Sequence, residues 1–195
     1  MRRSLAIWLV VMALVLVAAG FGAVRLSRYL AMIDQPAAPE STSGAPAAES
    51  RKIKARLFYV ADDGMRLAPG EREVPFGATT LEQARHIVEA QLEPAAPPLV
   101  SPIPAGTRLR SIYLTEANEA FVDLSAEVRS AHPGGLTNEI LTVYAVVDAL
   151  TVNLPALAGV QILVDGREVD TLAGHVDLRR PLTRSSLWVS EGEAH

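Results

Sequence analysis

A long uncharged segment near the N-terminus divides this 195-residue chain into parts with different physical properties. The twenty residues from Leu5 to Val24 carry no charge and are almost all apolar. About 20 such residues in a helix cross the hydrocarbon core of a bilayer, whereas the apolar core of a cleaved secretory signal, the alternative, usually runs about 7 to 15 residues. We therefore predict a retained signal-anchor, with a transmembrane helix at residues 5–25 and a short cytoplasmic tail at residues 1–4.

The segment that follows, residues 26–50, has the composition of a linker. Its second part, residues 35–50, is rich in Pro, Ala and Ser and has almost no bulky apolar side chain. Such a segment buries too little surface to fold, and its prolines keep it extended. Arginines lie on both sides of the span, so the positive-inside rule does not decide the orientation. The short tail and the linker favour a single-pass cell-membrane protein whose C-terminal domain, residues 51–190, is extracytoplasmic.

Charge and cysteine content exclude several classes of function for that domain. The chain has no cysteine, which excludes disulfides, thiolate metal sites, a cysteine nucleophile and a lipid-modified cysteine. Residues 51–195 carry 14 Lys and Arg against 19 Asp and Glu, a net charge of −5, and the basic residues are scattered. Nucleic-acid binding needs clustered positive charge, and phosphate cofactors need a glycine-rich loop at a strand-to-helix junction. Neither is present, so we expect no nucleic-acid partner, no metal and no cofactor.

The order of predicted elements in residues 51–190 is strand, strand, helix, strand, strand, helix, strand, strand. The two helices are marked by a capping-box pair, Thr79 and Glu82, and by a long apolar repeat that ends before Pro155. This order has too few strand–helix–strand crossovers for a doubly wound sheet, so we predict an α+β fold with two helices on one face of a mixed, largely antiparallel sheet. The expected bounds are strands at 53–60, 66–75, 109–115, 120–124, 160–164 and 168–172, with helices from residue 80 to before Pro94 and at 138–154.

The second helix has two apolar faces with different expected roles. Its main stripe should face the sheet, and it consists of Ile140, Val143, Tyr144, Val147, Leu150 and Leu154. The other face is a candidate interaction patch made of Leu141, Ala145, Asp148 and Val152. Asp148 has two interpretations, as a hydrogen-bonded carboxylate of the core or as part of this patch.

Several polar residues could carry chemistry if they converged in a pocket. His175 and Asp177 lie two residues apart, and Asp123 and Ser125 follow an expected strand. No nucleophile-elbow motif surrounds Ser125, so these residues are more easily explained as turn, cap and backbone-binding side chains. The enzymatic alternative is a peptidoglycan-binding or peptidoglycan-modifying protein that uses Asp123, Glu139, His175 and Asp177.

Five motifs in this order resemble the GerMN domain, a family found in sporulation and spore-germination proteins and in other bacterial envelope proteins. They are IPAGTRLRSIYL (103–114), AFVDLS (120–125), EILTVYAVVDALT (139–151), VQILVDGREV (160–169) and LAGHVDL (172–178). The chain departs from the family at Asp148 and Ala149, where Asn-Thr is more usual. The resemblance implies a fold similar to small ring-building motifs of envelope assemblies, and it brings no catalytic residues.

These observations lead to one functional hypothesis. We expect a non-catalytic, membrane-anchored module that binds envelope proteins or a second copy of itself, through a sheet edge or the second face of the long helix. Peptidoglycan is the other partner considered.

Overall fold

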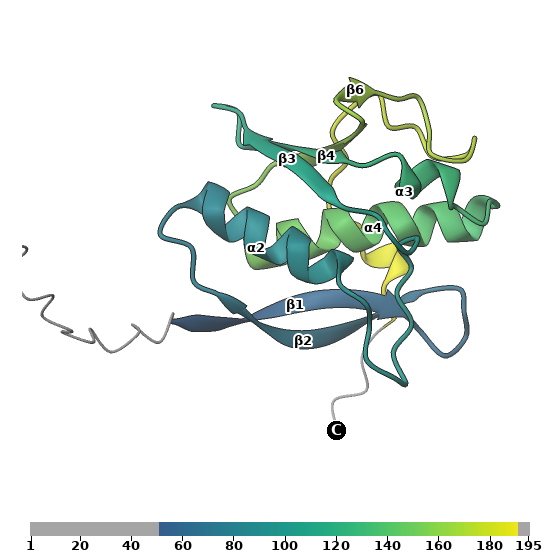
Figure 1. Cartoon of the computed structure of the whole chain (residues 1–195), viewed down its shortest axis with the longest axis horizontal. Helices are drawn as coiled ribbons and strands as arrows, with labels where there is room; N and C mark the ends of the chain where they lie inside the picture. Colours follow the sequence, from purple (N-terminus) through teal and green to yellow (C-terminus); the bar gives the residue numbers. More distant parts are fainter. Residues whose placement is uncertain (1–50, 191–195) are drawn as a thin grey trace, which may run out of the picture. The chain divides into compact units, whose positions relative to one another are not determined.

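The structure, a computed structural model, describes residues 51–190 and arranges them in three layers. Two helices form the middle layer, with a two-stranded sheet below and a four-stranded sheet above (Figure 1). The helix α4 contacts both sheets. The elements are β1 (Lys52–Val60), β2 (Leu67–Pro75), α2 (Thr80–Leu92), β3 (Leu109–Leu114), β4 (Glu119–Leu124), α3 (Glu127–Ser130), α4 (Leu136–Asn153), β5 (Gly159–Val164), β6 (Arg167–Glu168) and η1 (Ser186–Trp188).

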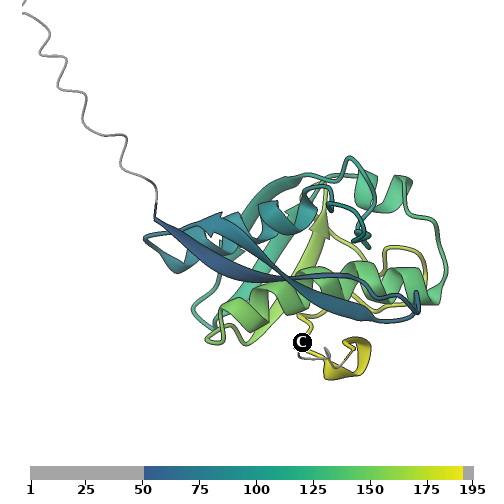
Figure 2. The same ribbon diagram turned by 90° about the horizontal axis from the view of Figure 1, so that it is seen from below.

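The predicted α+β fold with helices packed on a mixed sheet is confirmed, but the expectation that all the strands belong to one sheet is wrong. The antiparallel pair β1–β2 forms a sheet of its own, and it crosses over the helices on the side away from the other strands (Figure 2). The strand patterns alone cannot show this, because an amphipathic strand pair has the same alternation whichever sheet it joins.

The upper sheet has the strand order β3-β4-β5-β6 and is mixed. The pairs β3–β4 and β5–β6 are antiparallel, while β4 and β5 run parallel and are joined through α3 and α4. The turn before β6 uses Asp165 and Gly166 with φ values of 50° and 74°, as a tight hairpin turn requires. The strand expected at residues 168–172 is shorter in the structure, since only Arg167 and Glu168 pair with β5.

The helix α2 begins at the predicted capping box. The Thr79 hydroxyl accepts from the Glu82 N–H at 3.1 Å, and the Glu82 carboxylate accepts from the Thr79 N–H at 3.2 Å. This reciprocal pair satisfies N–H groups that have no partner within the helix. The buried side of α2 is built around Ile87, Val88 and neighbouring small or amide side chains, whereas Leu81 is 40% exposed.

Two side-chain amides from the helices bind the outer edge of β1. The Gln91 side chain accepts from the Phe58 N–H at 2.9 Å and donates to the Phe58 carbonyl at 2.8 Å. Asn153 at the end of α4 accepts from the Arg56 N–H at 2.9 Å and donates to the Arg56 carbonyl at 2.7 Å. Each amide thus replaces a neighbouring strand, and the edge is covered without a third strand.

Within residues 51–190, no helix is long and apolar enough to cross a membrane. The predicted span at residues 5–25 and the linker at residues 26–50 lie outside the described residues.

Replacing Gln91 by methionine should destabilise the domain by about 2 to 4 kcal/mol, because two buried backbone groups of Phe58 would lose their partners while the side-chain volume hardly changes. Thermal and urea unfolding measure this effect. Leu92→Met is the matched control on the same helix and should cost less than about 1.5 kcal/mol. Equal effects of the two substitutions would contradict the role given to the Gln91 amide.

Candidate functional site

The face of α4 predicted as an interaction patch is not a surface of this domain. Leu141, Ala145 and Asp148 are 2%, 0% and 0% exposed, and Val152 is partly buried against the core. Twelve of the 18 residues of α4 are buried, because the β1–β2 sheet covers the side that the other sheet leaves open. The expectation that this patch is open to a partner is therefore wrong.

A C-terminal strap, residues 182–190, crosses all three layers. Leu182 exchanges two backbone hydrogen bonds of 2.8 Å with Val160 of β5. The centroid of the Trp188 ring lies 6.4 Å from that of the Tyr144 ring on α4. The Ser190 N–H donates to the Leu67 carbonyl of β2 at 2.8 Å. The strap therefore ties the upper sheet, the long helix and the lower sheet together.

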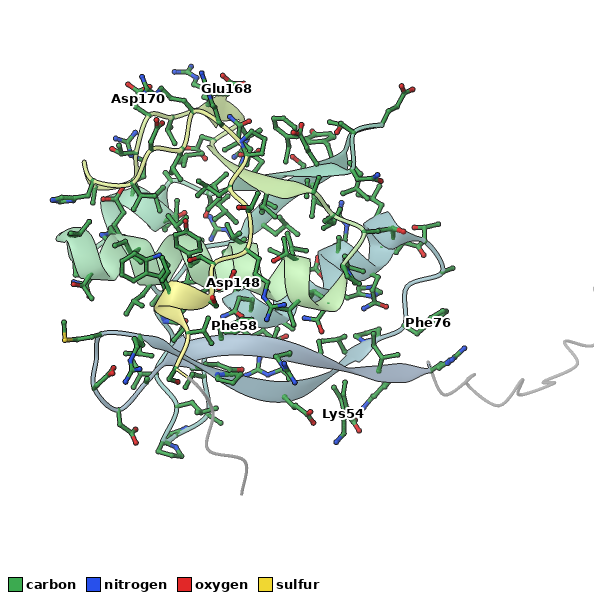
Figure 3. All side chains as sticks on the ribbon, turned by 180° about the vertical axis from the view of Figure 1, so that it is seen from behind. Lys54, Phe58, Phe76, Asp148, Glu168 and Asp170 are labelled. Carbon is green, nitrogen blue, oxygen red and sulfur yellow. The ribbon has the colours of Figure 1, made fainter. Side chains whose placement is uncertain are left out.

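Asp148 is a buried carboxylate beneath this strap (Figure 3). Its Oδ1 accepts from the Ser185 N–H at 3.2 Å, while its Oδ2 has no hydrogen-bond partner among the described residues. Burial raises the pKa of Asp148 to about 6, although the Ser185 N–H and the Arg184 charge act in the opposite direction. Of the two interpretations of this residue, the core carboxylate is the one that the geometry supports.

Glu139 anchors the loop that carries the LAGH motif. It is 0% exposed, and its Oε1 accepts from the N–H groups of Leu172 and Ala173 at 2.8 and 2.9 Å. Its Oε2 accepts from the His175 N–H at 2.8 Å and lies 3.0 Å from the His175 Nδ1. Burial raises the pKa of Glu139, but these donors outweigh it and hold the pKa below its ordinary value.

Asp123 has a similar anchoring role on the other side of the upper sheet. Its Oδ1 accepts from the Gly166 N–H at 2.7 Å, and its Oδ2 accepts from the Arg110 Nε at 3.1 Å. Arg110 also pairs with Asp165 at 3.3 Å, so the carboxylate fixes the β5–β6 turn against β3. Arg110 was not recognised from the sequence, because nothing in its local pattern shows that β3 and the 165–166 turn meet.

The four residues of the enzymatic alternative do not form one site. Only Glu139 and His175 touch, whereas Asp123 binds the β5–β6 turn and Asp177 pairs with Arg179 at 2.8 Å. Ser125 is also used internally, since its Oγ accepts from the Arg108 N–H at 2.9 Å. Among residues 51–190 no three His, Asp or Glu side chains are close enough to hold a metal ion.

An open, largely apolar groove lies beside the start of β3. This groove has a volume of about 1060 Å³, and most of its lining comes from the end of α2 and the proline-rich loop that follows. Leu99 and Val100 are 41% and 58% exposed there. Its lining ends at Leu109, the first residue of β3, so it adjoins the edge of the upper sheet.

Glu139→Gln should lower stability by about 2 to 4 kcal/mol, because the new amide donor would face the His175 N–H. The stability that the Glu139 carboxylate contributes in the wild type depends on pH. Because its pKa is lowered on folding, this stabilisation is fully present above about pH 4.5 and is lost as the pH falls through the folded-state pKa. Hydrogen exchange should show faster exchange at Leu172, Ala173 and His175. Unchanged protection of these amides would contradict the anchoring role.

Asp148→Asn should stabilise the domain at pH 8 by about 1 to 3 kcal/mol, because a buried charge is removed and the amide oxygen still accepts from Ser185. The raised pKa means that the wild type is free of this cost below about pH 4 and bears it fully above about pH 6. Melting temperatures of both proteins should therefore diverge as the pH rises. Asp170→Asn, at an exposed carboxylate, is the control and should show no such divergence.

Comparisons with known proteins agree with this architecture. The first GerMN domain of the sporulation protein GerM from Bacillus subtilis is 16% identical, with a TM-score of 0.51 over 68% of this chain and 97% of that chain. The tandem GerMN domains of the same protein give 16% identity and a TM-score of 0.50, and the matched region spans only 45% of that longer chain.

A Clostridium perfringens protein of known crystal structure shares 22% sequence identity with this chain. The match covers 68% of this chain and 87% of that chain, with a TM-score of 0.48. No curated protein matches the sequence. The family model of Germane, described as sporulation and spore germination, matches residues 56–170, more than half of the chain. The resemblance to the GerMN domain is thus confirmed, and the chain belongs to the Germane family.

Proposed function

We propose that this protein is a membrane-anchored, extracytoplasmic binding and assembly module of the bacterial cell envelope. The observation that carries the proposal is an apolar groove next to the edge strand β3, on a domain whose conspicuous polar residues are engaged internally. An apolar groove beside a strand edge suits an extended polypeptide, which gains main-chain hydrogen bonds from the edge and side-chain contacts from the groove.

The sequence supports the anchoring part of the proposal. The uncharged segment from Leu5 to Val24 is long enough to span a bilayer, and the Pro- and Ala-rich residues 35–50 would hold the domain away from it. A tethered domain meets other tethered proteins at a high effective concentration, so weak contacts at one surface are sufficient for assembly.

The non-catalytic nature of the module is part of the proposal. Asp123 is held inside the fold by Arg110 and the Gly166 N–H, and Glu139 accepts all its hydrogen bonds from the LAGH loop, while Asp177 pairs with Arg179 at the surface. Groups held in this way stabilise the fold and are not positioned around a common substrate.

A photo-crosslinking side chain at position 99 of the full chain, in native membranes, should give discrete adducts with envelope proteins. The same side chain at Lys54, which points away from the helices on the lower sheet (Figure 3), is the control and should give none. Equal labelling from both positions would contradict a binding surface at the groove.

The substitution His175→Ala distinguishes the proposed assembly function from the enzymatic alternative. The folded variant should keep both the adducts at position 99 and its cellular function, because His175 contributes only to loop anchoring. A folded His175→Ala protein that keeps the adducts but loses function would support the peptidoglycan-directed alternative.

A further inference from the structure

The outer strand of the upper sheet, β3, has an unpaired edge. The Thr115 N–H donates to the Glu119 carbonyl, so the main-chain groups of Thr115 face β4, and no register shift separates Thr115 from Ser111. In an antiparallel ladder the direction alternates, which turns the N–H and C=O groups of Ile112 and Leu114 away from β4. Within residues 51–190, no strand pairs with them on that side.

The other edges of the two sheets are covered, short or unsuited to pairing. Gln91 and Asn153 bind the outer edge of β1, and the strap pairs with the start of β2 at Leu67. β6 has only two paired residues. Natural proteins protect strand edges in these ways to prevent uncontrolled pairing. The rest of β2 carries Pro69 and Pro75, which have no N–H to donate, and the charged residues Glu71 and Glu73. β3 is therefore the edge of the described domain best suited to receive another strand.

The outer face of β3 carries an exposed aromatic side chain. Tyr113 is 57% exposed, and it stands directly opposite Phe121 of β4, which is only partly buried. Ile112, the preceding residue, is buried on the face toward the helices. The two aromatic residues thus form a short row that ends at the open edge, where a solvated strand would more commonly carry a charge.

We infer that β3 is a self-association edge, at which a second copy of this chain adds its own β3 in antiparallel orientation about a two-fold axis at Tyr113. This inference rests on the proposed assembly function and specifies one of its partners. The axis would place Ile112 opposite Leu114 of the second copy, and their outward N–H and C=O groups would form the ladder on both sides of the axis. The two four-stranded sheets then become one continuous sheet.

Side-chain pairing favours this register. Tyr113 meets Tyr113 of the second copy in a non-hydrogen-bonded pair, the position in which side chains approach most closely, and the row extends from Phe121 of one copy to Phe121 of the other. Ser111 would lie opposite Thr115 of the second copy, so small polar side chains flank the aromatic pair on both sides of the axis.

The two-fold arrangement also limits the assembly. Each copy has one β3 edge, and the pairing uses the same edge of both copies, so the contact closes at a dimer and does not propagate. Binding of other envelope proteins would then depend on the groove, since its lining overlaps β3 only at Leu109.

The absence of cysteine from the chain allows a direct test by disulfide crosslinking. Tyr113→Cys in the full chain, in native membranes under mild oxidation, should give a disulfide-linked dimer, because facing Cβ atoms come closest in a non-hydrogen-bonded pair, to about 4.5 Å, which a disulfide can span. Ser111→Cys and Thr115→Cys should form a mixed dimer when co-expressed and little dimer when expressed separately. Glu168→Cys on β6 is the exposed control and should remain monomeric (Figure 3).

A second measurement uses the purified full chain in detergent. Tyr113→Lys should keep its melting temperature, because the side chain is exposed, and should weaken dimerisation about tenfold or more by sedimentation analysis. If Tyr113→Cys forms no more dimer than Glu168→Cys, self-association through β3 is overturned. If the adducts at position 99 persist in that case, the proposed binding function still stands; if both are absent, both proposals fail.

Discussion

The enclosure of α4 between two sheets is the constraint on which the rest of this structure depends. An α-helix with one apolar stripe needs one partner layer, but α4 has apolar residues on almost every side and buries twelve of its 18 residues. The upper sheet covers one side, and the β1–β2 pair must cover another. The hairpin in turn depends on the helices, because two strands alone are marginally stable and the edge of β1 is completed by Gln91 and Asn153.

Buried carboxylates hold the connecting loops onto this layered core. Glu139 collects the backbone donors of the LAGH loop, and Asp123 fixes the β5–β6 turn together with Arg110. Both residues belong to motifs by which the family is recognised from sequence. Their geometry explains these motifs as the means of closing the fold, because an unsatisfied loop amide or an unpaired carboxylate at these positions would be costly. Asp148 is the exception, since one of its oxygens has no partner and its pKa is raised.

What remains for binding is the surface that this core does not use. The helix amides cover the edge of β1 and the strap pairs with the start of β2, while β3 and the adjoining groove expose main-chain groups, Tyr113, Leu99 and Val100. The same apolar residues would be unfavourable on an isolated soluble domain. They suit the proposed role, in which tethering at a membrane makes modest interfaces effective.

The sequence by itself determined the element order, the capping box at Thr79, the Asp165–Gly166 turn and the family, because these depend on local periodicity and short motifs. Only the tertiary structure decided that β1 and β2 form a separate sheet and that Leu141, Ala145 and Asp148 are buried. It also decided that Glu139 meets His175 while Asp123 and Asp177 lie in other contacts. The physical reason is that periodicity shows which faces of an element are apolar, whereas the layer that covers each face depends on contacts between residues far apart in the chain.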